Sequence, residues 1–195
     1  EFARVLQRCS VARLGSSIVP AHDELAYGEN FRQHVERIRA VAQILGDHGI
    51  RFGMEYCATP SLRIGKHHEF IHSLPQLREL IAAIGAPNLG LVLDSWHWWM
   101  SGSPSDELAA LRREEIVSLD LDDAPAGVPQ KLLGDRHREL PGTTGVIDLE
   151  RFVGTIRQLG YDGPVRAEPF EFPSLGLTAD EICRLARQSL RSVLS

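Results

Sequence analysis

The chain has 195 residues, of which 43% are hydrophobic and 24% are charged, and its formal net charge is −5. This composition is that of an ordinary globular protein and excludes a disordered or fibrous chain. The negative charge and the lack of clustered Lys and Arg argue against a nucleic-acid partner, which would need a basic surface. No apolar run approaches the roughly 20 residues of a membrane span, so we expect no membrane partner.

The cysteines Cys9, Cys57 and Cys183 are odd in number and widely spaced, without a CxxC pair. This spacing predicts neither a disulfide framework nor a zinc knuckle. Free thiols indicate a reducing compartment, so we expect a cytoplasmic protein. The chain begins with Glu1 instead of Met, which is consistent with a cut, a cloning scar or the edge of a partial gene.

The spacing of apolar residues in the first half of the chain predicts helices and strands in alternation. Gly46 and Gly49 are expected to end the main helix of this half. The predicted elements are the tail of a helix at Phe2 to Arg8, a strand at Leu14 to Val19, a polar loop at Ala21 to Asn30, a helix at Phe31 to Leu45, a strand at Arg51 to Tyr56 and a loop at Ala58 to Phe70.

The second half continues the alternation. Asp148 is a predicted helix cap, and Thr178 with Glu181 forms a predicted capping box for the last helix. The other predicted elements are a helix at Leu74 to Ile84, a strand at Leu89 to Asp94, a helix around Pro104 to Arg113, a strand at Ile116 to Leu121, a long polar loop at Asp123 to Pro141, a helix at Leu149 to Leu159 and a strand at Val165 to Glu168.

Strands separated by helix-length segments predict βαβ units and a parallel sheet, so the fold class is α/β. Four strands carry an acid within or at the end of the strand: Glu55, Asp94, Asp120 and Glu168. In a (β/α)₈ barrel such strand ends form one face, where acids from different strands meet. An open doubly wound sheet is the alternative, but no Gly-rich phosphate loop follows a strand. We therefore favour the barrel.

Several motifs occur together in the order expected of one family, and their residues run over almost the whole chain. With them, the chain resembles the xylose-isomerase-like TIM barrels, which include sugar isomerases, ketose 3-epimerases, inosose dehydratases and endonuclease IV. The resemblance implies a single domain over residues 1–195. The motifs are Gly53-Met-Glu55-Tyr, Asn88-Leu-Gly-Leu-Val-Leu-Asp94-Ser-Trp-His97, Asp123-Ala-Pro125, Arg138-Glu-Leu-Pro-Gly142, Gly145-Val-Ile-Asp148 and Gly160-Tyr-Asp-Gly-Pro-Val-Arg-Ala-Glu168-Pro-Phe.

In the epimerase branch, Glu, Asp, His and Glu from successive strand ends hold a divalent metal. The resemblance assigns Glu55, Asp94 and Glu168 to three of these positions and makes Glu55 and Glu168 the catalytic acid–base pair. It also implies that His97 and Arg138 bind substrate oxygens, with Arg136 as a weaker alternative. From the residues alone, Asp94 could instead cap the following helix beside a surface His97, and the nearby tryptophans could line the pocket or simply pack.

Two departures from the family pattern are visible. Asp120 stands where the family has its ligand His, and an all-oxygen site favours Mn²⁺ or Mg²⁺, with Co²⁺ or Zn²⁺ as alternatives. A shifted register with Asp122 or Asp123 as the ligand, or a site that has lost its metal, remains open. The second departure is length: counting back from Glu168 places Leu14 to Val19 near the fourth strand of eight. About the last five βα units of the barrel are therefore expected.

The resemblance implies a metal-dependent isomerase or epimerase that acts on a sugar or polyol ketone through an enediolate. It also implies a small-molecule partner and a homo-oligomer. An inosose-type dehydratase would use the same residues. An endonuclease IV-like phosphodiesterase is a rival that the acidic charge disfavours, and a catalytically inactive barrel is the third alternative.

Overall fold

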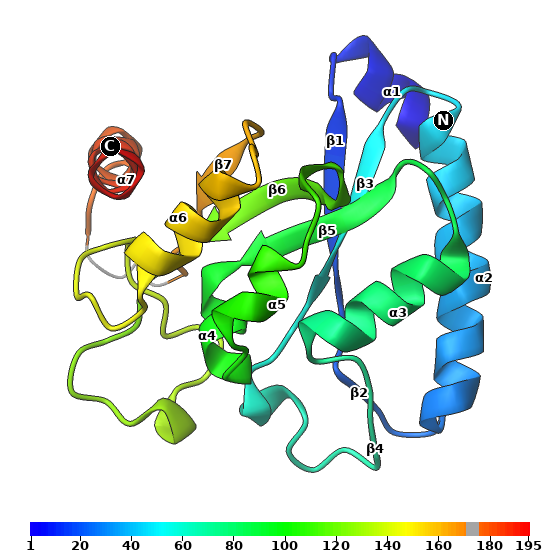
Figure 1. Cartoon of the computed structure of the whole chain (residues 1–195), viewed down its shortest axis with the longest axis horizontal. Coiled ribbons are helices and arrows are strands. Elements are labelled where there is room, and N and C mark those ends of the chain that lie inside the picture. The colour runs from blue at the N-terminus through cyan, green and yellow to red at the C-terminus, as the bar shows by residue number, and fades with distance from the viewer. Residues whose placement is uncertain (171–175) are drawn as a thin grey trace.

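The fold is half of a TIM barrel. The structure is a computed structural model that describes residues 1–170 and 176–195. Five parallel strands form one curved sheet in the order β1-β3-β5-β6-β7 (Figure 1), so each lies beside the next long strand along the chain. The predicted α/β class and the expected five βα units are confirmed. The strands are β1 (Arg13–Ile18), β3 (Arg51–Tyr56), β5 (Leu89–Asp94), β6 (Ile116–Leu121) and β7 (Val165–Ala167).

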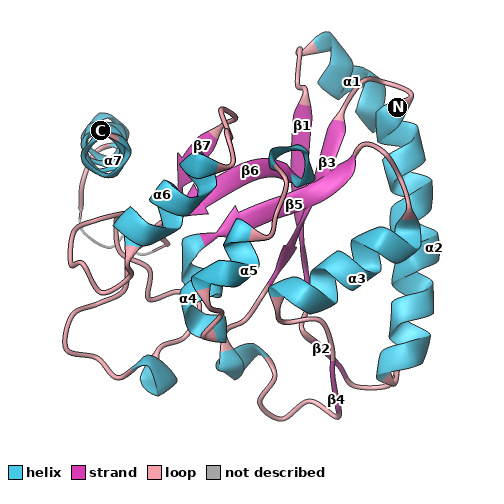
Figure 2. Ribbon diagram, viewed as in Figure 1, coloured by secondary structure: helices cyan, strands magenta, loops and turns pink. Residues whose placement is uncertain are grey.

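Helices connect the strands and cover the sheet from outside (Figure 2). A small antiparallel ladder joins β2 (Ala21–His22) to β4 (His68–Glu69). Short 3₁₀ turns lie at Pro60–Leu62, Arg113–Glu115 and Gln130–Leu132. The helices are α1 (Phe2–Arg8), α2 (Tyr27–Gly46), α3 (Leu74–Ile84), α4 (Ser95–Ser101), α5 (Ser105–Ala109), α6 (Leu149–Gln158) and α7 (Ala179–Leu194).

The core lies between the sheet and these helices. In α6 the predicted stripe of Leu149, Phe152, Val153 and Ile156 is entirely buried, which confirms the helical spacing. The side chain of Val92 fills the space over Gly53, where an added Cβ would lie 2.8 Å from Val92 Cγ2. A side chain at this position would therefore push the wall of the half-barrel apart.

The predicted polar loop at Ala21 to Asn30 is partly wrong, because α2 begins at Tyr27 and not at Phe31. Tertiary packing extends the helix: the Tyr27 ring lies 6.1 Å from that of Phe31 and 5.2 Å from that of Phe70, measured between centroids. Aromatic packing of this kind outweighs the weak helix propensity of the polar residues around it.

The helix predicted around Pro104 to Arg113 is also wrong in extent, because α5 covers only Ser105–Ala109. The additional helix α4 was not predicted. Most of α4 is buried, including Trp96, His97 and Trp98, so it lacks the polar face that makes a helix visible in sequence.

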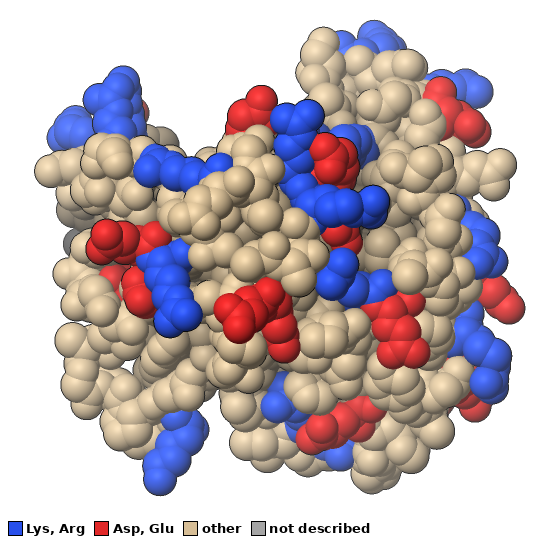
Figure 3. All heavy atoms as spheres, viewed as in Figure 1, with Lys and Arg blue, Asp and Glu red and all other residues tan. Residues whose placement is uncertain are grey.

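Both predicted caps are confirmed. The Asp148 side chain accepts a hydrogen bond from Arg151 N, and Thr178 forms a capping box with Glu181. Within the described ranges, none of the helices is both long and apolar enough to cross a bilayer. On the face shown in Figure 3, basic and acidic side chains are interspersed, so neither sign of charge dominates that face.

The long loop between β6 and α6 is organised by Asp123. This side chain is fully buried. Its Oδ1 accepts from the backbone N–H of Ala124 and Ile147, at 2.9 and 3.0 Å, and its Oδ2 accepts from Thr144 and Gly145, at 3.0 and 2.8 Å. These four bonds hold the two ends of the loop together, so both Asp123 oxygens are already engaged with the backbone.

Replacing Asp123 with Ala removes an acceptor that several buried N–H groups share. We expect the free energy of unfolding to fall by about 2–4 kcal/mol, because hydrogen bonds to a charged group contribute more than neutral ones and the donors are left unpaired. Urea unfolding measures this loss. Asp148→Ala, which removes only a helix cap, should cost about 1 kcal/mol. Equal losses in the two variants would contradict the organising role of Asp123.

Candidate metal centre

The carboxyl ends of the strands bring most of the predicted acids to one edge of the sheet. Asp94 ends β5 and is the register partner of Asp120 in β6, which in turn pairs with Arg166 in β7. Glu55 lies near the end of β3, and Glu168 follows β7 directly. Parallel strands in adjacent register therefore place these side chains next to one another.

Two groups of three carboxylates have oxygens within 4.8 Å of one another. One consists of Glu55, Asp120 and Glu168, and the other of Asp94, Asp122 and Glu168. Glu168 belongs to both, so the two groups form one continuous acidic centre. Carboxylate oxygens at such spacing are the ligands that Mg²⁺ and Mn²⁺ prefer.

Asp94 serves two purposes at once. Its Oδ1 accepts from Trp96 N at 2.6 Å and so begins α4, while its Oδ2 accepts from Arg138 Nη1 at 2.6 Å. The helix-cap interpretation is therefore correct for one oxygen, and the other faces the acidic centre. The surface interpretation of His97 is wrong, because its side chain is only 1% exposed.

Arg138 lies at the middle of the centre, as a buried cation among acids. Its Nη1 donates to Asp94 Oδ2 at 2.6 Å, to Asp122 Oδ2 at 2.9 Å and to Glu168 Oε2 at 3.1 Å. Its Nη2 donates to Asp135 Oδ1 at 3.1 Å. The sequence indicated Arg138 through family resemblance, whereas its contacts with Asp122 and Asp135 were not foreseen. By contrast, Arg136 is exposed.

Asp120 is held by a second arginine that sequence reasoning missed. Arg166 Nε donates to Asp120 Oδ1 at 2.8 Å, and Arg166 Nη2 donates to Asp120 Oδ2 at 2.6 Å and to Glu168 Oε1 at 2.8 Å. Both oxygens of Asp120 are thus engaged, whereas Asp122 Oδ1 is buried without a partner among the described residues. The spacing of two residues between Arg166 and Glu168 could have indicated that Arg166 lies at the centre, since alternate strand residues share a face.

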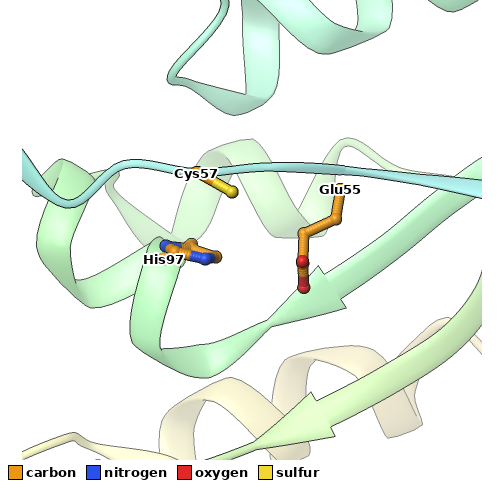
Figure 4. A group of neighbouring side chains, drawn as sticks. All are labelled: Glu55, Cys57 and His97. Carbon is orange, nitrogen blue, oxygen red and sulfur yellow. The ribbon is translucent and has the colours of Figure 1, made fainter. Parts of the chain in front are cut away.

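Glu55, Cys57 and His97 form a third group, with one ligand-competent atom from each lying within 4.8 Å of the others (Figure 4). Burial raises the pKa of the Cys57 thiol to about 12, which keeps it protonated. His97 Nδ1 accepts from Ala58 N at 3.1 Å, so the ring proton resides on Nε2. Cys57 therefore presents an S–H group and not a thiolate, and His97 presents an N–H group at Nε2 and not a free nitrogen lone pair. Both groups act as hydrogen-bond donors.

The acids of the centre differ in charge state because they share few cations. Burial, followed by the nearby carboxylates, raises the pKa of Glu55 well above its usual range and that of Asp122 to about 9. Burial also raises the pKa of Asp94, but Arg138 and His97 outweigh it and the net pKa is lowered. The Asp94 carboxyl beside Arg138 therefore loses its proton at a lower pH than the carboxyls of Glu55 and Asp122.

Comparison with known proteins gives one family. The model of the protein family described as "Xylose isomerase-like TIM barrel" matches residues 1–192. An inosose isomerase of Halalkalibacterium halodurans is 27% identical over 89% of this chain and 58% of its own length. A 3-dehydroshikimate dehydratase of Pseudomonas putida is 30% identical over 82% of this chain and 24% of its own length. The chain therefore spans only part of these curated relatives.

Solved structures share the same architecture. A xylose isomerase domain protein from Alicyclobacillus acidocaldarius subsp. acidocaldarius has a TM-score of 0.83 and 34% identity, covering 98% of this chain and 67% of that chain. The IOLI protein, crystallised with a binding zinc atom, has a TM-score of 0.85 and 22% identity over 100% of this chain and 66% of its own. Both cover nearly the whole half-barrel.

The charge states predict how the stability of the metal-free chain depends on pH. Asp122 has a folded-state pKa of about 9 against an ordinary value of 3.8, so its contribution to stability is lost as the pH rises between these values. We expect the unfolding free energy, measured in urea with chelator, to decline less steeply from pH 5 to pH 9 in Asp122→Asn. The same slope in both proteins would contradict a protonated Asp122.

Proposed function

The chain belongs to the xylose isomerase-like TIM barrel family, and we propose that it forms the catalytic face of a divalent-metal-dependent isomerase or epimerase of sugar or polyol ketones. The observation that carries this proposal is the cluster of acids at the strand ends, in which the buried Asp94 and Asp122 and the partly buried Glu168 have oxygens within 4.8 Å of one another. The inosose isomerase relative supports the reaction class.

The residues fit a divalent cation. Within residues 1–170 and 176–195, Glu55 Oε1 and Asp122 Oδ1 are buried oxygens without a hydrogen-bond partner, and such atoms are costly unless a ligand satisfies them. We assign Glu55, Asp94 and Glu168 as ligands, together with Asp120 or Asp122 from the β6 end. The oxygen donors favour Mn²⁺ or Mg²⁺, while the zinc in the IOLI structure makes Zn²⁺ the alternative.

When bound, a divalent ion supplies Lewis-acid chemistry that polarises a carbonyl and stabilises negative charge on its oxygen. The proton transfers then fall to Glu55 and Glu168. These residues come from β3 and from the end of β7, with two strands between them, so they approach the centre from different sides. Burial raises the pKa of both carboxyls, which suits groups that accept and return a proton near neutral pH.

His97 and Arg138 would hold substrate oxygens. Because Nδ1 of His97 accepts from Ala58 N, the ring proton is on Nε2. His97 can therefore donate a hydrogen bond from Nε2 to a substrate oxygen, but neither ring nitrogen is free to take a proton from the substrate. Burial lowers the pKa of His97, which keeps the ring neutral. Arg138 Nη2 lies 3.1 Å from His97 Nε2, so the guanidinium brings a positive charge next to that donor. Two carboxyls that transfer protons and two donors that bind oxygens suit a ketone with a neighbouring hydroxyl. These side chains are Glu55, Glu168, His97 and Arg138.

If the substrate loses water after the proton has been removed, the enzyme is a lyase. The 3-dehydroshikimate dehydratase relative, a dehydratase by name, makes this the alternative. The proton removal next to the carbonyl is common to both outcomes. An isotope-exchange experiment therefore tests the shared step first, and the products then separate isomerase from lyase.

Deuterium exchange tests this function. The Mn²⁺-loaded chain, incubated with ketohexoses and inososes in D₂O, should introduce deuterium at the carbon next to the carbonyl of its substrate, as followed by proton NMR. Glu55→Gln should slow this exchange by about 10²–10⁴-fold, because it removes a group that carries the proton. Formation of an epimer or isomer supports the proposal, whereas a new C=C signal identifies the lyase.

Glu139→Gln is the matched control, since Glu139 is exposed and lies in the loop that carries Arg138. This variant should exchange at the rate of the unaltered chain. Failure of the metal-loaded chain to exchange any of the ketones would contradict the proposed function. Equal loss in both Glu variants would remove the assignment of Glu55 to the proton transfer.

A further inference from the structure

The guanidinium of Arg138 has two edges with different partners: Nη1 contacts the acids of the centre, whereas Nε and Nη2 contact Asp135. The Arg138 side chain is only 2% exposed. Nη1 contacts carboxylate oxygens of Asp94, Asp122 and Glu168 at 2.6, 2.9 and 3.1 Å. A single Nη1 carries two hydrogens, so three acceptors compete for two protons. This nitrogen is surrounded by oxygens in the way that a small cation would be.

The group that surrounds Nη1 is also one of the groups suited to a metal. Asp94, Asp122 and Glu168 each offer an oxygen within 4.8 Å of the others. Oxygen ligands on opposite sides of Mg²⁺ or Ca²⁺ are about 4–5 Å apart, since each metal–oxygen distance is roughly 2.0–2.6 Å. The Nη1 end of Arg138 and a divalent ion would therefore need the same space.

The other edge of Arg138 is fixed outside the carboxylate group. Nε donates to the Asp135 carbonyl at 3.1 Å and Nη2 to Asp135 Oδ1 at 3.1 Å. Asp135 Oδ1 also accepts from Thr59 Oγ1 at 3.0 Å, and Thr59 Oγ1 accepts from Trp96 Nε1 at 3.0 Å. This chain of bonds anchors one edge of the guanidinium without using any of the three carboxylates around Nη1.

Arg138 satisfies this group only in part. Asp122 Oδ1 keeps no partner among the described residues. Arg138 Nη2 lies 3.1 Å from His97 Nε2, which carries the ring proton because Nδ1 accepts from Ala58, so two donors face each other. The guanidinium also brings one positive charge to three carboxyls, where a divalent ion would bring two. A divalent ion could therefore replace the Nη1 end of Arg138 among these three carboxyls.

We propose that the Nη1 end of Arg138 and a divalent cation are alternative occupants of the Asp94, Asp122 and Glu168 group, so that metal binding must displace Arg138. The inference rests on the proposed function and adds to it a residue that sets the metal affinity. In the metal-free chain Arg138 neutralises the acids and stabilises the fold. When metal binds, Nη1 is released from the carboxylates and becomes available to a substrate oxygen.

The exchange predicts that removing the guanidinium strengthens metal binding. Arg138→Met should bind Mn²⁺ at least about tenfold more tightly by titration calorimetry. If Arg138 leaves the site free in less than about a tenth of the molecules, the apparent affinity of the unaltered chain is reduced at least about tenfold. Without metal, Arg138→Met should melt at a lower temperature than the unaltered chain. Added Mn²⁺ should then raise its melting temperature by more than it raises that of the unaltered chain.

Arg136→Met is the matched control, because it removes the same charge from the same loop at an exposed position. It should leave both the Mn²⁺ affinity and the metal-free melting temperature unchanged. Arg138→Lys, which keeps a charge but loses the forked contact with Asp135, should bind Mn²⁺ with intermediate affinity. This second variant keeps the test decisive if Arg138→Met does not fold.

The outcomes are distinguishable. Tighter Mn²⁺ binding in Arg138→Met and Arg138→Lys, but not in Arg136→Met, supports the exchange. Mn²⁺ binding that is unchanged or weaker in the Arg138 variants overturns the exchange and leaves the proposed function standing. Equal tightening in all three variants overturns it as well, since general charge would then explain the effect. If none of the proteins binds Mn²⁺, both the exchange and the metal-dependent function are wrong.

Discussion

The half-barrel depends on neutralising acids that its own topology forces together. Parallel strands in register place Asp94 beside Asp120, and the residues after the strands add Asp122 and Glu168 to the same edge. Unpaired buried charge is strongly unfavourable, so a fold of this kind needs cations or protons at this edge. In the metal-free chain Arg138 and Arg166 supply positive charge, and burial raises the pKa of the Glu55 and Asp122 carboxyls.

Polar groups around the acids are held by hydrogen bonds. Asp123 uses both oxygens to close the long loop that carries Arg138, and Asp135 with Thr59 then fixes one edge of the guanidinium. The helix α4 begins on Asp94, which couples the start of that helix to the charge at the centre. Replacing Arg138 by another cation at the centre would therefore affect both the loop that carries Arg138 and the start of α4.

The sequence predicts β3, β5, β6 and β7 well because each of these four strands combines a short apolar run with an acid at or near its end, and β3 has the bounds predicted for it. It fails for α4, whose buried Trp96 and Trp98 leave no polar face to mark the helical period. At the centre, strand ends and family resemblance indicated Glu55, Asp94 and Glu168. The contacts of Arg166 and Asp135 depend on strand register and on a long loop, which local patterns do not encode.

A manganese-loaded crystal of this chain would test most directly whether the strand-end acids form a metal centre. Diffraction at the manganese edge locates the ion without assumptions about its ligands. We expect one anomalous peak bounded by the carboxylates of Asp94, Asp122 and Glu168, with the Nη1 end of Arg138 withdrawn from them. A peak elsewhere, or Arg138 still among these carboxylates in a manganese-saturated crystal, would contradict it.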